Sequence, residues 1–435
     1  MTSSSPAIEL PASASPALSF VVLLTRGAEI TTPCLQSIAA AVAHARLEAE
    51  VVLVDARRDI EPSRSLRAQA GGARVVAAPQ GLNVGTAVGW NLAFAAARAE
   101  RVILLQEDAR LAVDFLDHVL SAAEKEPRAA VVGARHHDDA GTTTNLGTVV
   151  WRDGFVTRLG PVNAPFLEAP AKAYEMPATS LAAALVNRDA WQEVGGFDER
   201  LFPTIYNDVD FCMAVRSFGW IVLCAPGARA QHVPGTATTD SARPRRSGEL
   251  RRFLSVRNRE RLIAKWDAHL AARPERPPGV SPDEVPPDVL RAALEQPAAA
   301  PDPVTAMRPV TGPGWPPATV IDESVERELL TAQVELLEGF ATWLVEEEMA
   351  TYVARLEEVV ASAERARADA EGRLDDVGTA YRSLASQHEE LTAWAKELET
   401  RKREVEAELE RVVQSRGWRA VKAFRALTRR NETGR

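Results

Sequence analysis

Four side chains in this sequence have the chemistry of a reaction centre: Asp55, Asp108, Asp208 and His232. One carboxylate and one imidazole suit a divalent cation that also binds phosphate oxygens. A separate carboxylate can remove a proton from an incoming hydroxyl group. Each residue alone has a simpler explanation, because an aspartate after a strand often caps the next helix, and a single histidine is more often an ordinary loop residue. The four form a site only if the fold brings them together.

Asp208 lies where a helix is expected to begin. Asn207 has the side chain of a good N-cap, Asp208 falls in the first turn, and Gly219 suits the C′ position at which a helix ends. Apolar residues recur with helical spacing between them, which predicts a buried face. Asp210 lies roughly 200° around this helix from Asp208 and is expected to support the structure. Helix capping alone would explain Asp208, and the alternative is a catalytic base.

Short apolar runs alternate with helical patterns in the first third of the chain. The runs expected to form strands are residues 18–24, 50–55, 74–78, 101–106 and 129–133. This alternation predicts an α/β fold with a mostly parallel sheet covered by helices on both faces. Ligands bind beyond the carboxyl ends of the strands in such sheets. Asp55 and Asp108 both follow strands directly, so the sheet would bring them to one edge. Later elements are expected as a hairpin at 148–157, strands at 179–186 and 220–224, and a closing helix at 250–269.

The composition restricts the class of protein. The chain has 435 residues, which exceeds one ordinary core, and its formal net charge of −9 argues against general nucleic-acid binding. Its three cysteines lack metal or redox spacing and fit a reducing, cytoplasmic compartment. Residues 1–16 are rich in Ser, Ala and Pro and predict a disordered tail rather than a signal peptide. No apolar run is long enough to predict a membrane-spanning helix.

The following part of the chain changes composition twice. Residues 271–320 predict a semi-rigid linker, because 13 of the 28 prolines lie between residues 271 and 317. Residues 321–412 predict a charged helical region with small or apolar residues at seven-residue intervals from Leu356 to Val412. That repeat favours a coiled coil and a homo-oligomer. A single charged helix packed on the preceding domain is the alternative.

Residues 413–435 predict a basic amphipathic helix. Between residues 411 and 435, eight basic residues stand against one acidic residue. Such a helix can lie on an anionic membrane surface, where each cation contributes roughly 1 kcal/mol. A solvated tail, or simply the end of the coiled coil, is the alternative.

Several motifs occur in order along residues 17–270. They are N-V-G-T-A-V-G-W-N at 83–91, Q-E-D at 106–108, G-G-F-D-E at 195–199, N-D-V-D-F-C at 207–212, His232, and R-N-R at 257–259. Together they resemble the inverting family 2 glycosyltransferases, which have the GT-A fold. In that family the first motif contacts the sugar nucleotide and the second binds a metal. The third is a turn on the acceptor side, and the fourth carries the base.

The resemblance implies a role for each matching residue. Asp208 would be the catalytic base, and Asp108 and His232 would bind Mg²⁺ or Mn²⁺. The other candidates would contact a nucleotide-diphosphate sugar, and they are Thr25, Asp55, Asn83, Gly85, Asn91, Gln106, Glu107 and Arg246. Arg246 comes from a basic loop, residues 236–252, whose arginines can neutralise a leaving diphosphate. The acceptor would be a glycan or lipid-linked glycan in cell-wall or surface polysaccharide synthesis. The enzyme would then be cytoplasmic or peripheral at the inner face of the membrane.

The sequence departs from the family at two places. Asp55 is followed by Ala-Arg-Arg, where the family usually has Asn-x-Ser after its aspartate. Gln106 stands where the metal motif usually has an acid, so cation binding would depend on Asp108 and His232. With this motif and the heptad region, a non-catalytic scaffold for other glycan-assembly enzymes is the alternative function. A nucleotidyltransferase would need a glycine-rich basic loop after the first strand, and residues 25–27 contain one glycine.

Overall fold

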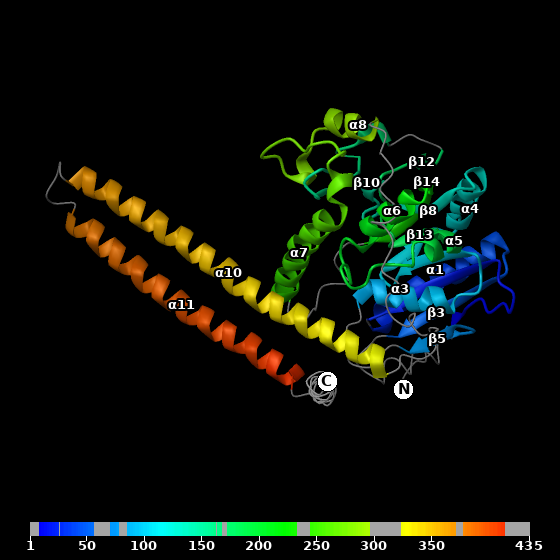
Figure 1. Cartoon of the computed structure of the whole chain (residues 1–435), viewed down its shortest axis with the longest axis horizontal. Helices are drawn as coiled ribbons and strands as arrows, with labels where there is room; N and C mark the ends of the chain where they lie inside the picture. The colour runs from blue at the N-terminus through cyan, green and yellow to red at the C-terminus, as the bar shows by residue number, and fades with distance from the viewer. Residues whose placement is uncertain are drawn as a thin grey trace, which may run out of the picture. The chain divides into compact units, whose positions relative to one another are not determined.

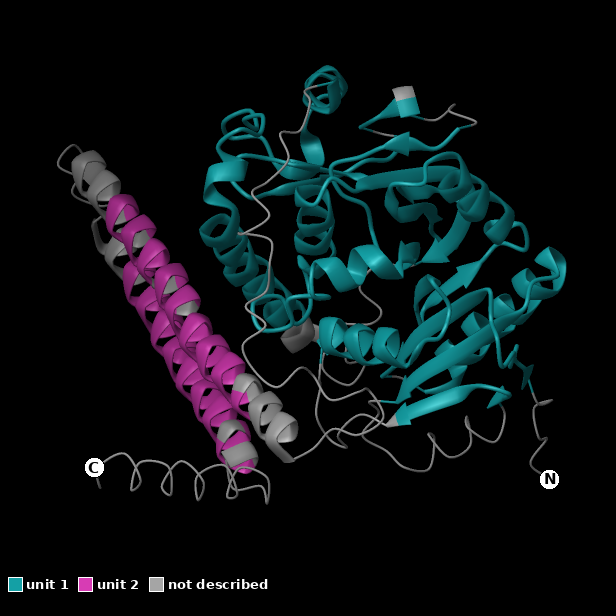
Figure 2. Cartoon of the chain, turned by 45° about the vertical axis from the view of Figure 1, so that its right-hand side comes forward, with its two compact units in different colours: residues 1–326 teal, residues 327–435 magenta. Residues whose placement is uncertain are grey.

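The chain divides into two compact units, Met1–Glu326 and Arg327–Arg435 (Figure 2). The computed structural model describes residues 8–25, 27–55, 70–77, 85–161, 163–167, 172–232, 244–295, 323–370 and 377–413. The first unit contains the sheet and every candidate site residue, and the second consists of helices. The boundary between the units falls between Glu326 and Arg327.

A mixed sheet forms the centre of the first unit (Figure 1). Its main path runs β12-β14-β8-β13-β6-β2-β3-β5. The strands are β2 (Leu18–Leu24), β3 (Ala49–Asp55), β5 (Arg74–Ala77), β6 (Arg101–Gln106), β8 (Ala129–His137), β12 (Tyr174–Glu175), β13 (Ala183–Asn187) and β14 (Ile221–His232). Strands β5, β3, β2 and β6 are parallel, and so are β8 and β14. Strand β13 lies between these groups, antiparallel to β6 and β8, so the sheet is less uniformly parallel than predicted.

Helices cover both faces of the sheet, which explains the continuous apolar strands. Every residue of β2 is buried. Helices α1 (Ala28–Ala45) and α4 (Phe115–Lys125) share one core with the strands. On the other face lie α3 (Gly85–Ala96), α5 (Arg188–Glu193) and α6 (Asn207–Ser217). The Phe197 ring joins them, because its centroid is 5.3 Å from that of Trp90 in α3 and 4.4 Å from that of Phe211 in α6.

The amino-terminal segment is ordered from residue 8. Strand β1 (Ile8–Glu9) pairs in parallel with β4 (Ala70–Gly71), and Ile8 and Leu10 are buried. The disordered tail expected over residues 1–16 is therefore wrong for residues 8–16. Two apolar side chains, one on each side of an exposed glutamate, are enough to dock this segment on the core. The first seven residues lie outside the described part.

The first part of the expected linker also packs on the rest of the first unit. Helix α8 (Pro287–Glu295) buries Leu290 in a core with Trp151 of the hairpin formed by β10 (Thr148–Val150) and β11 (Val156–Arg158). The Thr157 hydroxyl donates to the Pro282 oxygen at 2.7 Å. A linker beginning at residue 271 is thus wrong, because Pro282 and Pro287 begin short helices, where proline is compatible with packing. Residues 296–322 lie outside the described residues.

The second unit is a pair of long helices. Helices α10 (Glu323–Ala370) and α11 (Val377–Val413) lie side by side and run in opposite directions (Figures 1 and 2). The guanidinium of Arg355 lies 5.6 Å from the Trp394 ring centroid, and Leu391 is buried. The heptad face of α11 therefore contacts α10 of the same chain. The helical region is present, whereas a coiled coil between chains remains a prediction. The basic tail lies outside the described residues beyond Val413, and none of the described helices is long and apolar enough to cross a membrane.

Candidate active site

The metal-ligand candidates meet at the carboxyl edge of the sheet. Strand β6 ends at Gln106, and β7 (Ala109–Leu111) then pairs antiparallel with the end of β14, which brings back His232. The His232 Nε2 atom lies 3.0 Å from Gln106 Oε1 and 3.5 Å from Asp108 Oδ1. Strand β14 continues well beyond the predicted end at Cys224 and includes His232 itself. The sheet therefore holds the histidine that the sequence placed in a loop.

The donor atoms of this group fit Mg²⁺ or Mn²⁺. Asp108 offers a carboxylate oxygen, Gln106 an amide oxygen and His232 an imidazole nitrogen, and hard divalent cations accept such ligands. Within the described ranges, no three His, Cys, Asp or Glu side chains are grouped to enclose a metal. Cation binding by this group therefore stays a prediction. The hydrogen bond between His232 and Gln106 uses the nitrogen that would bind the cation, so cation binding would replace it.

Glu107 has a structural partner. Both carboxylate oxygens of this buried residue accept from the backbone N–H of Thr25, at 3.0 Å each, and the Thr25 hydroxyl donates to one of them. These bonds tie the end of β2 to the residue that follows β6. Thr25 and Glu107 therefore fix the shape of the edge, and their contact with a donor stays a prediction.

Three other donor-binding candidates are placed only in part. Asp55 ends β3, is buried, and lies beside Leu24 of β2 in the strand register, so it shares the edge with Thr25. Asn83 lies outside the described residues. Arg246 belongs to the first turns of α7 (Pro244–Leu270), but its side chain lies outside the described part.

The start of α3 contacts the loop before α6. Gly85 has a φ of +76°, and a Cβ at this position would lie 2.6 Å from the backbone oxygen of Pro203, so only glycine fits. The buried Asn91 side chain donates to the Phe197 oxygen at 2.9 Å and to the Glu199 carboxylate, and it accepts from the Phe197 N–H at 2.9 Å. Its amide is fully engaged in this turn. Asn91 therefore holds this turn in place, and its contact with the donor stays a prediction.

Asp208 lies in the first turn of α6, as predicted, but the cap differs. The N-cap residue is Tyr206, with a left-handed φ of 69°, and Asn207 lies inside the helix, so the N-cap expected at Asn207 is wrong. Asp208 Oδ1 accepts from the Val209 N–H at 2.9 Å. Burial raises the pKa of Asp208, and the positive charge of Arg158 opposes that rise. A carboxylate with a raised pKa is a stronger base toward a hydroxyl group.

The closing helix α7 holds the segment around Asp208 through buried polar contacts. Lys265 Nζ lies 2.8 Å from Asp210 Oδ1 and 3.0 Å from Asp198 Oδ2, and the Trp266 indole donates to Asp210 at 2.7 Å. Asp198 belongs to the G-G-F-D-E turn and Asp210 to α6. One lysine therefore joins three elements, which supports the structural role expected for Asp210.

His136 is a site neighbour that the sequence did not suggest. It lies on β8, and its ring centroid is 5.4 Å from that of His232, in an edge-to-face arrangement. Burial, followed by the charges of His232 and Arg158, lowers the pKa of His136 to about 3, so the ring is neutral at ordinary pH. Its strand adjoins β14, but nothing in the local sequence separates His136 from the adjacent His137. Only the strand pairing reveals the contact.

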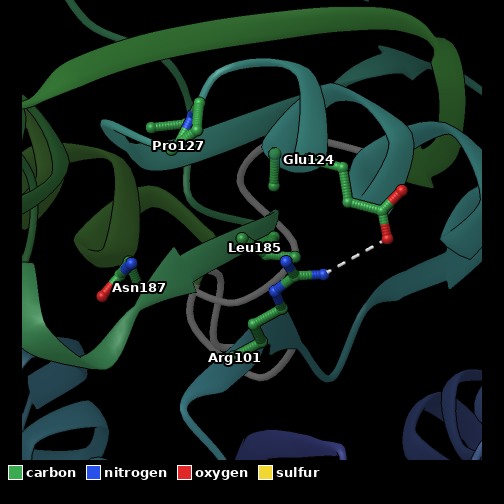
Figure 3. Close-up of a pocket in the computed structure, with 7 residues that line it drawn as sticks. Arg101, Glu124, Pro127, Leu185 and Asn187 are labelled. Carbon is green, nitrogen blue, oxygen red and sulfur yellow. Dashed lines mark ion pairs between the residues drawn. The ribbon is translucent and has the colours of Figure 1, made fainter.

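A cavity of about 270 Å³ lies at the opposite, amino edge of the sheet (Figure 3). Arg101 and Ala129, the first residues of β6 and β8, line it together with Asn187. The Arg101 guanidinium pairs across it with Glu124 at 3.7 Å. Because ligands of such sheets bind at the carboxyl edge, this cavity is separate from the candidate active site.

An aspartate and a histidine that meet at the carboxyl edge of such a sheet are typical of an α/β enzyme acting on a phosphate-bearing substrate. The chain belongs to the glycosyltransferase-like family 2, which matches residues 16–248, just over half of its length. That membership supports glycosyl transfer as the activity, which is proposed below. It also confirms the predicted α/β GT-A sheet with flanking helices.

The curated relatives match over shorter segments. An N-acetylglucosaminyl-diphospho-decaprenol L-rhamnosyltransferase of Mycobacterium tuberculosis is 29% identical over 143 residues, which cover 30% of this chain and 46% of that protein. An uncharacterized protein of Sinorhizobium fredii is 24% identical over 196 residues, which cover 44% of this chain and 21% of the relative. The chain therefore spans less than half the length of each of these relatives.

Two solved structures are similar to parts of the chain at low sequence identity. The crystal structure of GalNAc-T7 with UDP, GalNAc and Mn²⁺ is 14% identical, with a TM-score of 0.45, and the match covers 59% of this chain and 50% of that one. The crystal structure of S. aureus TarS is 14% identical, with a TM-score of 0.35, and the match covers 50% and 37% of the two chains.

Proposed function

We propose that the chain transfers a sugar from a nucleotide-diphosphate sugar to an acceptor hydroxyl group with inversion at the anomeric carbon. One observation carries the proposal: at the carboxyl edge of the sheet, Gln106 Oε1 and Asp108 Oδ1 both lie within 3.5 Å of the Nε2 atom of His232. Asp208 provides a second, separate carboxylate on α6. Metal binding and proton removal are thus assigned to different residues.

In this reaction Asp208 accepts the proton of the acceptor hydroxyl. The hydroxyl oxygen forms a bond to the anomeric carbon as the bond from that carbon to the diphosphate breaks on the opposite face. A single displacement of this kind inverts the configuration. Mg²⁺ or Mn²⁺, when held by Asp108 and His232, would stabilise the charge that develops on the leaving diphosphate. Asp55 and Thr25 lie at the same edge, where they would contact the nucleoside.

The acceptor is proposed from the relatives. The rhamnosyltransferase of Mycobacterium tuberculosis is named for a lipid-diphosphate-linked sugar, which supports a glycan or lipid-linked glycan acceptor in cell-wall or surface polysaccharide synthesis. We place the enzyme in the cytoplasm or at the inner face of the membrane, with residues 413–435 as the contact. Self-association through the helical unit is part of the same proposal.

Donor hydrolysis tests the proposal without knowledge of the acceptor. The full chain would be incubated with individual UDP-, GDP- and dTDP-sugars and Mn²⁺, and release of the nucleoside diphosphate would be measured. We expect release with one donor, abolished by EDTA and by Asp108→Ala. Asp117→Ala is the matched control, because it removes an exposed aspartate of α4 that pairs with His44 on the surface. Release that Asp108→Ala leaves unchanged would contradict the assigned metal site.

A further inference from the structure

The turn of the β10–β11 hairpin contacts the residue that precedes α6. The hydroxyl group of the buried Tyr206 donates to the backbone oxygen of Gly154 at 3.1 Å. Gly154 has a φ of +72°, and a Cβ there would lie 2.7 Å from the Ile263 side chain, so the turn is packed closely against α7. Tyr206 is the N-cap of α6, two residues before Asp208. One hydrogen bond therefore joins the hairpin to the segment that carries the candidate base.

The backbone of Tyr206 determines where α6 begins. Its φ of +69° is left-handed, and a non-glycine residue keeps this conformation only where the surrounding structure fixes it. The Asp210 N–H donates to the Tyr206 oxygen at 2.9 Å, which closes the first turn of the helix. A shift of Tyr206 would therefore shift the first turn, and Asp208 with it.

Residues that follow α7 hold the turn of the hairpin. Arg276 donates to Oδ2 of Asp153 from Nε at 3.1 Å and from Nη2 at 2.9 Å. Its guanidinium also lies 4.8 Å from the Phe155 ring centroid. The Arg152 N–H donates to the Pro274 oxygen at 3.0 Å. These contacts reach the residues on both sides of Gly154, so they fix the oxygen to which the Tyr206 hydroxyl donates.

The residues that hold the hairpin lie beyond the part of the chain that matches the family. That match ends at residue 248, whereas Arg276 and its neighbours follow α7. The same segment also holds the body of the hairpin, because the Thr157 hydroxyl accepts from the Trp151 indole at 2.8 Å and donates to the Pro282 oxygen. The position of the hairpin therefore depends on residues that the family model does not include.

We propose that Arg276 and Tyr206 are positioning residues for the candidate base. Arg276 fixes the turn of the hairpin, and the turn fixes Asp208 through the Tyr206 hydroxyl group. Neither residue is assigned a contact with a substrate. The inference rests on the proposed function, because it concerns the orientation of Asp208 toward an acceptor hydroxyl group. A displacement of about 1 Å at a reacting group can cost roughly 100-fold in rate, so a small movement of this turn affects transfer.

Steady-state kinetics of the full chain test the two contacts. We expect Tyr206→Phe and Arg276→Gln each to lower kcat for transfer roughly tenfold or more, while donor binding measured by calorimetry stays unchanged. Tyr174→Phe is the matched control for the tyrosine, because its hydroxyl group also donates to a backbone oxygen, that of Leu146 at 2.8 Å. Arg128→Gln is the control for the arginine, because Arg128 forms an exposed pair with Glu126.

A double variant shows whether Arg276 acts through Tyr206. If it does, adding Arg276→Gln to Tyr206→Phe should slow transfer little further, because residues that act through one contact give non-additive losses. Losses that multiply in the double variant would overturn the inference. Full kcat in either single variant would overturn it as well.

Hydrogen exchange at the start of α6 gives a readout that needs neither donor nor acceptor. Backbone amides in peptides covering residues 203–210 should exchange roughly tenfold faster in Tyr206→Phe and in Arg276→Gln, and at the wild-type rate in the two controls. Unchanged exchange in this segment would overturn the inference. Faster exchange in a chain that transfers no sugar from any donor would instead count against the proposed function, while the link from Arg276 to α6 stands.

Discussion

The side-chain amide of Asn258 donates to the backbone oxygen of Ile205 at 2.8 Å, and Ile205 has a left-handed backbone with a φ of +57°. Tyr206, the next residue, is also left-handed at +69°. Each non-glycine residue in this conformation costs roughly 1–2 kcal/mol. Asn258 is fully buried and also donates to the Thr204 oxygen at 2.7 Å. Helix α7 thus stabilises the strained turn that positions Asp208.

Asn258→Ala should slow transfer more than it weakens donor binding. Loss of two hydrogen bonds to buried carbonyls should lower the free energy of unfolding by about 1–3 kcal/mol. The turn should relax, and a misplaced Asp208 should reduce kcat by up to about 100-fold. Urea unfolding and steady-state kinetics measure the two effects. Asn187→Ala is the control, because it removes the cap of α5 at the amino edge. If both variants kept full kcat at similar stability, Asn258 would have no part in positioning the base.

Asp208→Asn should reduce transfer by about 10²–10⁴-fold, because the amide cannot accept the acceptor proton. Donor binding should remain, since Asp208 lies outside the group formed by Gln106, Asp108 and His232. Calorimetry with the donor and a coupled transfer assay measure the two quantities. Asp189→Asn, which changes an aspartate in the first turn of α5, is the matched control. Full activity of Asp208→Asn would disprove the assignment.

The pH profile should follow the environment of Asp208. Protonation inactivates a base, so kcat/KM should fall as pH falls through its pKa. Burial raises that pKa, and the Arg158 charge opposes the rise. The acidic limb of the kcat/KM profile should therefore lie at higher pH than it would for an exposed aspartate. In Arg158→Gln this limb should move to still higher pH. A limb that stays in place in this variant would show that another group controls it.

The sequence predicted the parts of this fold that depend on local patterns. Continuous apolar runs identified the strands, because a strand buried on both faces is apolar at every position. Helical spacing of apolar residues after a cap-like segment located α6. The antiparallel insertion of β13 was not predicted, since a fully buried strand has the same composition in either direction. The docking of Leu10 and Leu290 was also missed, because Pro-rich composition describes average behaviour and not single apolar contacts.

The sequence predicted which residue types belong to the site, and their roles in the reaction stay predictions. Asp108 and His232 were paired correctly, since strand ends converge. Asn91 and Glu107 form hydrogen bonds that hold other segments of the chain. The local sequence does not show these bonds, because they depend on which groups the fold brings beside each side chain. His136 and Arg158 carry no local pattern. These two residues come close to the site only when β8, β14 and the β10–β11 hairpin pack together.

Mn²⁺ should raise the thermal stability of the wild-type chain, because a ligand that binds only the folded state stabilises it by mass action. His232→Ala and Asp108→Ala should each abolish most of the rise in Tm, since each supplies one of the few ligands from the protein. His44→Ala, on the surface of α1 and 3.1 Å from Asp117, is the control. Equal shifts in wild type and both site variants would place the metal elsewhere.

Lys265→Met should destabilise the first unit strongly. The Lys265, Asp198 and Asp210 side chains are 10%, 11% and 3% exposed, so the substitution leaves two buried carboxylates without their cation. Breaking a buried ion pair by removing one partner costs about 3–5 kcal/mol. Arg128→Met is the control, because Arg128 forms an exposed pair with Glu126, and such pairs contribute about 0–1 kcal/mol.

The loss of folding stability in Lys265→Met should be smaller at low pH and larger at high pH. Burial raises the pKa of Asp210 in the folded chain, and the charge of Lys265 is the largest effect that opposes this rise. Without the lysine, folding favours the protonated acid, so the variant should regain stability as pH falls through the folded pKa and lose it as pH rises. Urea unfolding of wild type, Lys265→Met and the triple variant Lys265→Met/Asp198→Asn/Asp210→Asn measures the effect. The triple variant should recover much of the stability at neutral pH, because it buries no unpaired charge. A single variant whose loss is the same at every pH would show that the lysine acts through packing alone.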